Sequence, residues 1–171
     1  GLQDQYAITY FLLEYDLLQA NRQISSLPYV LGQYEKNSID INVVLRVSDK
    51  VFNILMTENT SLNHRDEIKL FIGCCEYIKT YRSFRSAMSL YKRAYTKLLL
   101  LQEQYLNSGK GYFEFIHRFV NSYLSLHMDL EAQLLMKKSL QVIDKFEFSS
   151  EKVKETILAK LLNRLCVTHK S

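Results

Sequence analysis

The sequence contains no tryptophan, one proline (Pro28) and only five glycines in 171 residues. A chain built from β-strands needs a turn about every 8 to 12 residues, and Gly and Pro supply most such turns. Their scarcity excludes an all-β fold. With 47% hydrophobic and 23% charged residues, the composition is that of a folded domain and not of a disordered chain. We therefore expect an all-α protein.

Long hydrophobic runs are also missing. Runs such as residues 98–101 are far shorter than the roughly 20 residues that cross a bilayer, and no segment resembles a signal peptide. Three cysteines, two of them adjacent at Cys74 and Cys75, do not form a disulfide framework, which favours a reducing compartment. We predict an intracellular protein of the cytoplasm or nucleus, without a membrane partner.

The length suits one continuous core, so we predict a single helical domain over residues 1–171. The chain begins with Gly and not with Met, and helical patterning starts within a few residues. We therefore expect it to be a fragment of a larger protein.

Apolar residues recur at three- and four-residue steps, which predicts about seven amphipathic helices. The predicted helices cover residues 4–23, 40–55, 66–81, 83–106, 112–127, 129–146 and 150–165. Pro28 breaks the chain after the first of them, before a short helical piece that ends at Tyr34. Phe84 opens the apolar stripe of the fourth predicted helix.

Capping residues and loops support these boundaries. Side chains that can accept a hydrogen bond from a first helical turn precede four of the helices: Asp40, Ser83, Asp129 and Ser150. The polar run 58–64 predicts a loop. Residues 107–109, which end in a glycine, predict the stop of the fourth helix.

Two predicted helix pairs match at a period of 45 residues when Ala87 is aligned with Ala132. The first pair carries large, small and aromatic residues at Phe71, Cys74, Cys75, Ile78, Ala87, Tyr91 and Ala94. The second carries them at Ile116, Phe119, Tyr123, Ala132, Met136 and Ser139.

This order resembles the tetratricopeptide repeat over residues 66–146. The resemblance implies a TPR-like α-solenoid of antiparallel helical hairpins, with the flanking helices as further or capping hairpins. The usual Trp and helix-ending Pro are missing, and Cys75 and Val120 stand where the family has Gly. A plain helical bundle is therefore the alternative architecture.

The sequence contains no catalytic or metal-ligating pattern. His117 and His127 are ten residues apart, and no paired C-x-x-C or H-E-x-x-H motif occurs. Cys74 and Cys75 fall on an apolar helix side, where cysteine usually acts as a small hydrophobe. The turn at residues 108–110 lacks the upstream glycine of a phosphate-binding loop. We therefore expect a non-enzymatic protein that needs neither metal nor cofactor.

Basic residues are concentrated in residues 69–110, which carry eight Lys and Arg against two acids. The main hypothesis is an interaction module or scaffold that holds an acidic peptide or a partner helix in a helical groove. The residues predicted to contact the partner are Lys79, Tyr81, Arg82, Arg85, Lys92, Arg93 and Tyr95. The alternative to a binding surface is that these basic residues simply form an ordinary helix face exposed to solvent.

Other functions remain open. The chain resembles, in general texture, the helical sensor domains of peptide-responsive transcription regulators. A basic stripe is also compatible with nucleic acid, which we rank behind an acidic protein because the net charge is only +4. Self-association through the last predicted helix, residues 150–165, is a further hypothesis, because its leucines would be exposed at an uncapped end.

Overall fold

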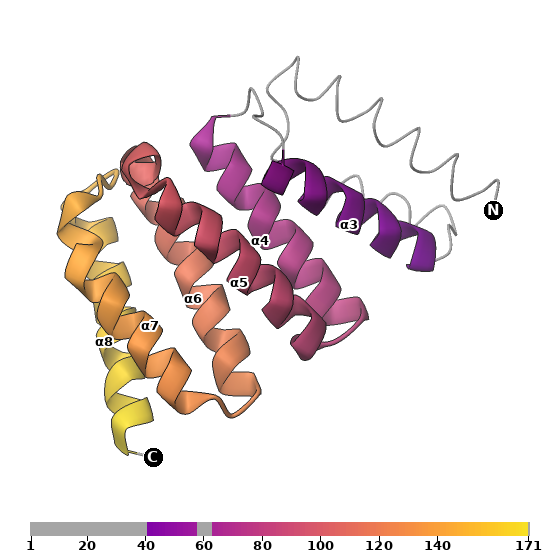
Figure 1. Ribbon diagram of the computed structural model, residues 1–171. Helices are drawn as coiled ribbons and strands as arrows, with labels where there is room; N and C mark the ends of the chain where they lie inside the picture. The colour runs from indigo at the N-terminus through magenta and orange to yellow at the C-terminus, as the bar shows by residue number, and fades with distance from the viewer. Residues whose placement is uncertain (1–40, 58–62, 171) are drawn as a thin grey trace. The chain divides into compact units, whose positions relative to one another are not determined.

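The computed structural model describes residues 41–57 and 63–170 (Figure 1). This part of the chain is all helical and has no strand, so the predicted all-α class is confirmed. Its helices are α3 (Ile41–Thr57), α4 (His64–Tyr81), α5 (Phe84–Leu100), η2 (Gln102–Ser108), α6 (Gly109–Ser125), α7 (Asp129–Val142), η3 (Ile143–Lys145) and α8 (Glu151–Lys170). The predicted helix 4–23, the piece ending at Tyr34 and the cap at Asp40 lie outside the described residues.

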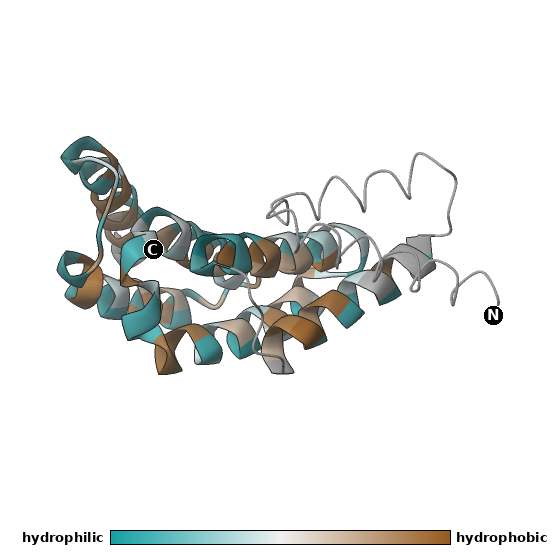
Figure 2. Ribbon diagram, turned by 90° about the horizontal axis from the view of Figure 1, so that it is seen from above, coloured by the Kyte–Doolittle hydropathy of each residue, from teal (hydrophilic) through white to brown (hydrophobic). Residues whose placement is uncertain are grey.

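The chain divides into two compact units, residues 1–86 and 87–171. Helix α5 begins in the first unit and runs on into the second. Hydrophobic and hydrophilic residues alternate within single helices (Figure 2), as expected where one helix face is buried and the other meets water. No helix of the described ranges is both long enough and apolar enough to cross a membrane.

The described core of the first unit lies between α3 and α4, which pack side by side (Figure 1). The rings of Phe52 and Phe71 meet edge to face, with centroids 5.6 Å apart. The Cys74 thiol lies 3.7 Å from the carbonyl oxygen of Ser48, to which it donates a hydrogen bond. Helical spacing predicts most of these inward positions. The buried residues among those described are Leu45, Ser48, Val51, Phe52, Leu55, Glu67, Ile68, Leu70, Phe71, Cys74, Cys75 and Ile78.

Side-chain caps set the starts of α4 and α5, and Ser150 caps α8 in the same way. The Ser83 hydroxyl accepts a hydrogen bond from the backbone N–H of Ser86 at 3.0 Å, as predicted for the start of α5. Helix α4 starts earlier than predicted, because the Asn63 side chain accepts from the N–H of Asp66 at 2.9 Å and so caps a helix that begins at His64. His64, predicted to lie in the loop at residues 58–64, is therefore the first residue of α4.

Helix α6 is the centre of the second unit and packs against η2, α7 and α8. It buries residues on most of its circumference: Gly109, Tyr112, Phe113, Phe115, Ile116, Phe119, Val120, Ser122 and Tyr123. Tyr91 of α5 packs on it, with its ring centroid 5.4 Å from that of Phe115 and 5.5 Å from that of Phe119. Aromatic side chains thus fill much of the core of this unit.

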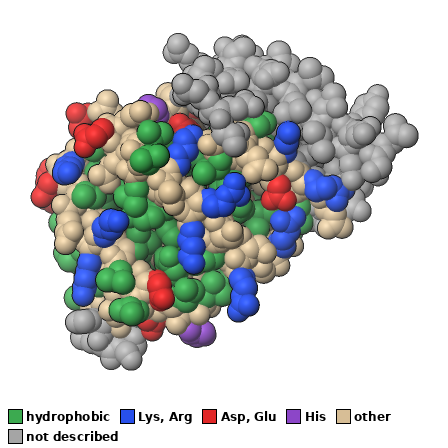
Figure 3. Space-filling view, in the orientation of Figure 1, with side chains coloured by type: hydrophobic (Ala, Val, Ile, Leu, Met, Phe, Trp, Pro, Cys, Tyr) green, Lys and Arg blue, Asp and Glu red, His purple; other side chains and the backbone are tan. Residues whose placement is uncertain are grey.

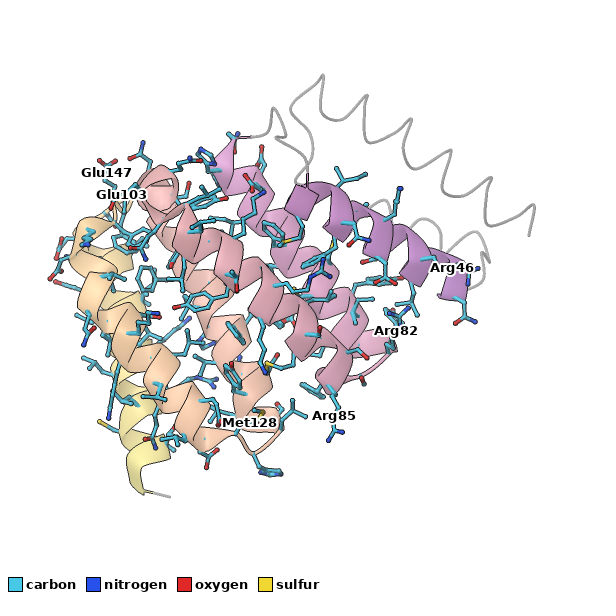
Figure 4. The ribbon with its side chains drawn as sticks, viewed as in Figure 1. Arg46, Arg82, Arg85, Glu103, Met128 and Glu147 are labelled. Carbon is cyan, nitrogen blue, oxygen red and sulfur yellow. The ribbon has the colours of Figure 1, made fainter. Side chains whose placement is uncertain are left out.

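The helical run of α5 and η2 ends at Ser108, within the predicted stop at residues 107–109. Gly109, however, is not the residue that stops it, because Gly109 begins α6 with helical dihedral angles, φ −54° and ψ −47°. The segment after η3 folds back at this point, where the N–H of Glu147 donates to the carbonyl of Leu106 at 2.7 Å. Figure 4 labels Glu147 beside Glu103 of η2, at this end of the unit. The glycine therefore serves a close backbone approach and not a left-handed turn.

Two predicted helices are shorter than expected. The fourth ends as an α-helix at Leu100 and continues as the 3-10 helix η2, and the sixth changes to the 3-10 helix η3 at Ile143. Asp129 is the first residue of α7 and not its cap. At this position its negative charge still stabilises the helix by interacting with the positive end of the helix dipole. Phe84 is 39% exposed, so it does not open the buried stripe of α5.

The turn between α6 and α7 closes in a left-handed conformation. His127 has φ 57°, and its N–H donates to the carbonyl of Leu124 at 3.0 Å. The N–H of Met128, labelled in Figure 4, donates to the carbonyl of Tyr123 at 2.9 Å. This pair of bonds is a Schellman motif, in which the left-handed residue is usually glycine. Here a histidine occupies it.

Candidate partner-binding grooves

The predicted contact residues are divided between the two units. Lys79, Tyr81, Arg82 and Arg85 belong to the first unit, and Lys92, Arg93 and Tyr95 belong to the second. On the face shown in Figure 3, Lys and Arg side chains lie mostly singly, separated by hydrophobic and other side chains. The seven predicted contact residues therefore do not all belong to one compact unit.

In the first unit, two of the predicted cations are held by carboxylates. Arg82, labelled near the end of α4 in Figure 4, lies 3.3 Å from the Asp49 carboxylate of α3. Lys79 Nζ lies 2.6 Å from the Glu76 carboxylate and 5.8 Å from the centroid of the Phe84 ring. These pairs neutralise part of the charge that the sequence predicts for a partner.

In the second unit, Lys92 and Tyr95 line a groove of about 340 Å³ between α5, α6 and α7. We call it the α5–α7 groove, and its lining residues are Lys92, Tyr95, Thr96, Phe119, Tyr123, Glu131, Leu134, Leu135 and Lys138. Two of the seven predicted contact residues therefore meet in one hollow, together with α6 and α7 residues that the sequence reasoning did not assign to a site.

Aromatic rings form the floor of the α5–α7 groove. The rings of Tyr95 and Phe119 meet edge to face at 5.5 Å, and those of Phe119 and Tyr123 stack at 4.7 Å. Burial raises the pKa of Tyr95, and burial together with the charge of Glu131 raises the pKa of Tyr123. Both phenols therefore stay neutral at physiological pH, and the floor is an apolar surface with hydroxyl groups.

The rim of the α5–α7 groove combines charge with an exposed leucine. Lys92 and Lys138 are exposed and stand on α5 and α7, and Glu131 stands one helical turn from Leu134. Leu134 itself is 59% exposed, although it lines a groove. An exposed apolar side chain next to an aromatic floor is typical of a surface that another molecule covers.

A second groove, of about 300 Å³, lies between α6 and α8 in the same unit. We call it the α6–α8 groove, and it is lined by Lys110, Phe113, Glu114, His117, Lys152, Val153, Thr156, Ile157, Lys160 and Leu161. Sequence reasoning missed it. The available signal was the four-residue spacing of Lys152, Thr156 and Lys160, but nothing in the sequence indicates which helix face α8 turns toward α6.

His117 lies half-buried in the α6–α8 groove. Burial lowers its pKa, the positive charges of Arg164, Lys160 and Arg118 lower it further, and only Glu114 acts in the opposite direction. The lowered pKa, caused first by burial, favours the neutral imidazole at pH 7.

The cysteines do not form a reactive centre in the described ranges. Cys74 and Cys75 are fully buried, and burial raises the pKa of Cys74 to about 12, so its thiol stays protonated at neutral pH. Cys166 is exposed on α8. Within residues 41–57 and 63–170, no group of three or more His, Cys, Asp or Glu is placed to hold a metal ion.

Comparisons with protein-family models, with curated proteins and with solved structures find no match for this chain. The grooves and their side chains are therefore the basis for a functional proposal.

Proposed function

We propose that the chain is a non-enzymatic protein-interaction module that holds a segment of a partner protein in the α5–α7 groove. The observation that carries this proposal is the exposed Leu134 beside the aromatic floor of Tyr95, Phe119 and Tyr123. A partner's apolar side chain would remove Leu134 from water and pack on the ring of Tyr95, which is the partly exposed one of the three. Burial of apolar surface of this kind supplies about 25 cal/mol per Å² before the costs of association.

The two rim lysines would orient the partner. Lys92 and Lys138 stand on different helices of the groove, so carboxylates of an acidic segment could contact either side of it. Rim charges act mainly on association rate and specificity, whereas the apolar contacts at the centre supply most of the affinity. An acidic segment with at least one large apolar residue is therefore the partner that this groove favours.

For the architecture we propose a tetratricopeptide-like array of antiparallel hairpins, in preference to a plain bundle. Its support is that the small residues of the repeat pattern are all buried, with Ala87, Ala94 and Ala132 at 0% exposure and Ser139 at 2%. Small side chains at such positions allow neighbouring helices to approach closely. In arrays of this kind, grooves between stacked helices are the usual binding surfaces.

The test is affinity purification of the protein, with nuclease treatment and mass spectrometry. We compare the wild type with Leu134→Glu, and we use Leu100→Glu as a control because Leu100 is 81% exposed and does not line the groove. The proposal would be supported by proteins that are still recovered after nuclease treatment, that are lost with Leu134→Glu and that are retained with Leu100→Glu.

Two other outcomes would contradict it. An identical set of proteins from all three forms would mean that partners bind elsewhere. Recovery of nucleic acid alone would favour the nucleic-acid alternative, in which affinity falls steeply with salt.

A further inference from the structure

The α6–α8 groove has an organised lining. From α6 it receives Lys110, Phe113, Glu114 and His117, which recur at three- and four-residue steps and so share one helix face. From α8 it receives two parallel rows. The polar row is Lys152, Thr156 and Lys160, and the apolar row is Val153, Ile157 and Leu161. The groove therefore has an apolar floor with a basic row along one side.

The lysines of this groove are free to meet a ligand. Lys110, Lys152 and Lys160 are exposed, and among the described residues none of them takes part in an ion pair. The lining contains one carboxylate, that of Glu114, and the guanidinium of Arg118 already contacts it at 2.9 Å. Three cations thus face a groove whose carboxylate is already paired.

His117 provides a second observation about this groove. His117 lines the groove from α6, and the nearby cations Arg164, Lys160 and Arg118 all disfavour its protonated form, as burial does. In the described part of the chain, the Nδ1 atom of His117 is buried without a hydrogen-bond partner. An incoming carboxylate would be attracted by the same charges.

We propose that the α6–α8 groove is a second docking site, separate from the α5–α7 groove, which binds an acidic peptide segment of a partner protein. Apolar side chains of the peptide pack on Val153 and Ile157, the partly exposed residues of the apolar row, and its carboxylates face the lysines. The peptide thereby matches both features of the lining, the apolar floor and the unpaired positive charge.

The spacing of the basic row limits the sequence of the peptide. Lys152 and Lys160 are eight residues apart on one helix, which separates them by about 12 Å along the axis at 1.5 Å per residue. An extended peptide advances about 3.3 Å per residue, so its carboxylates would be about four residues apart. A helical peptide would carry them about eight residues apart.

Nucleic acid fits this lining less well. A phosphate backbone needs a continuous series of cations or helix N-termini, and single-stranded binding usually adds aromatic rings on which bases stack. In the α6–α8 groove the only aromatic carbocycle, Phe113, is 1% exposed, so its faces are not open to a base. The aliphatic row of α8 offers no hydrogen bonds to a base edge.

The test is selection of random peptides of about 12 residues, displayed on phage, against the full chain, since that length spans both lysines in an extended or a helical form. The enriched peptides are then titrated by fluorescence anisotropy against Lys152→Glu, Lys160→Glu. The matched control is Lys137→Glu, Lys145→Glu, which changes the net charge equally at exposed lysines outside both grooves. Melting curves of all variants check that they are folded.

We expect the enriched peptides to combine Asp or Glu at the stated spacing with large apolar residues. Their affinity should fall at least about tenfold in the groove variant, which is about 1.4 kcal/mol, and change less than about twofold in the control. Replacement of the peptide carboxylates by amides should weaken binding similarly. Leu134→Glu should leave these peptides bound, which separates this site from the proposed function of the other groove.

Four results would overturn the proposal. They are no enrichment at all, enrichment of peptides without acidic residues, equal loss in the groove variant and the control, and loss with Leu134→Glu in place of the groove variant. Displacement of the peptides by a short oligothymidylate, with the same dependence on Lys152 and Lys160, would instead assign the groove to nucleic acid.

Discussion

The carbonyl oxygen of Glu147 accepts a hydrogen bond from the backbone N–H of Gly109 at 3.2 Å and lies 2.5 Å from the point where a Cβ on Gly109 would stand. The ring of Phe148 comes within 3.0 Å of the same point. Only glycine at position 109 lets the segment after η3 come so close to the start of α6. This contact fixes the path of the chain from α7 to α8, and so it helps to position the α6–α8 groove.

Gly109→Ala is expected to lower the free energy of unfolding by about 1–3 kcal/mol, because the new methyl group would meet a backbone oxygen that cannot move aside easily. Chemical denaturation measures it. Gly111→Ala, on the same helix, is the control for helix propensity and should be neutral or stabilising. Equal effects at the two positions would show that the Glu147 segment does not pack on Gly109.

His127→Gly is expected to stabilise the protein by up to about 1 kcal/mol. His127 adopts the left-handed conformation of the Schellman motif, in which a residue with a Cβ is less stable than glycine by about 1–2 kcal/mol. Glycine loses more conformational entropy on folding, which offsets part of this gain. Thermal and urea denaturation should both show the gain. A loss of stability would mean that the His127 side chain makes a contact worth more than the backbone strain.

Ala132→Leu should destabilise the protein by about 1–3 kcal/mol or more, because Ala132 is fully buried on α7 and the larger side chain has no space. The matched control is Ala159→Leu, at an exposed position of α8, which should change stability by less than about 0.5 kcal/mol. Urea denaturation of both variants provides the comparison. If Ala132→Leu were tolerated as well as the control, close helix approach at this position would be disproved.

Acid should destabilise the protein through His117. Its pKa in the folded state lies below the ordinary value of about 6.5, so the unfolded chain takes up a proton first as the pH falls. The stabilising contribution is complete above about pH 6.5 and is lost as the pH falls from there toward the lowered pKa. NMR titration of the imidazole should show the lowered value directly, and His117→Gln should reduce the pH dependence of unfolding between pH 7.5 and 5.5, a range chosen to bracket about 6.5. An NMR pKa at or above 6.5 would contradict the argument.

The three thiols should differ in reactivity. Cys166 is exposed, whereas Cys74 and Cys75 are buried between helices of the first unit. Ellman's reagent should therefore label one thiol per chain rapidly in the folded protein and all three in denaturant. Cys166→Ser should abolish the rapid phase. Rapid labelling of the variant would show that α4 opens from α3 on the time scale of the reaction.

Helix identity follows from local rules, and the sequence predicts it well. The apolar steps through Ala87, Tyr91, Ala94 and Leu98 depend only on the geometry of one helix, and all four residues are buried. The caps at Ser83 and Ser150 are equally local, and the Ser150 hydroxyl accepts from the N–H of Val153 at 3.2 Å. Neither feature requires knowledge of the rest of the fold.

The boundaries that sequence reasoning missed depend on residues far apart in the chain. As a glycine after a polar run, Gly109 is expected to end a helix. It begins one instead, and its N–H donates to the carbonyl of Glu147, which is distant in sequence. Likewise the sequence gives no sign that Arg82 is paired, but the structure places it 3.3 Å from the Asp49 carboxylate of another helix. The pattern of residues along one segment contains no information on such tertiary contacts.

The sequence by itself determined the helical class, most helix positions and the inward faces, because each follows from the 3.6-residue period and from hydrogen bonds within one turn. Tertiary structure alone decided which side chains share a groove. Lys110 and Lys152 come together because α7 and its turns bring α8 back to α6, and Lys92 meets Lys138 for a similar reason. The physical reason is that a helix face is set by local geometry, whereas its neighbour is set by how the whole unit buries its apolar surface.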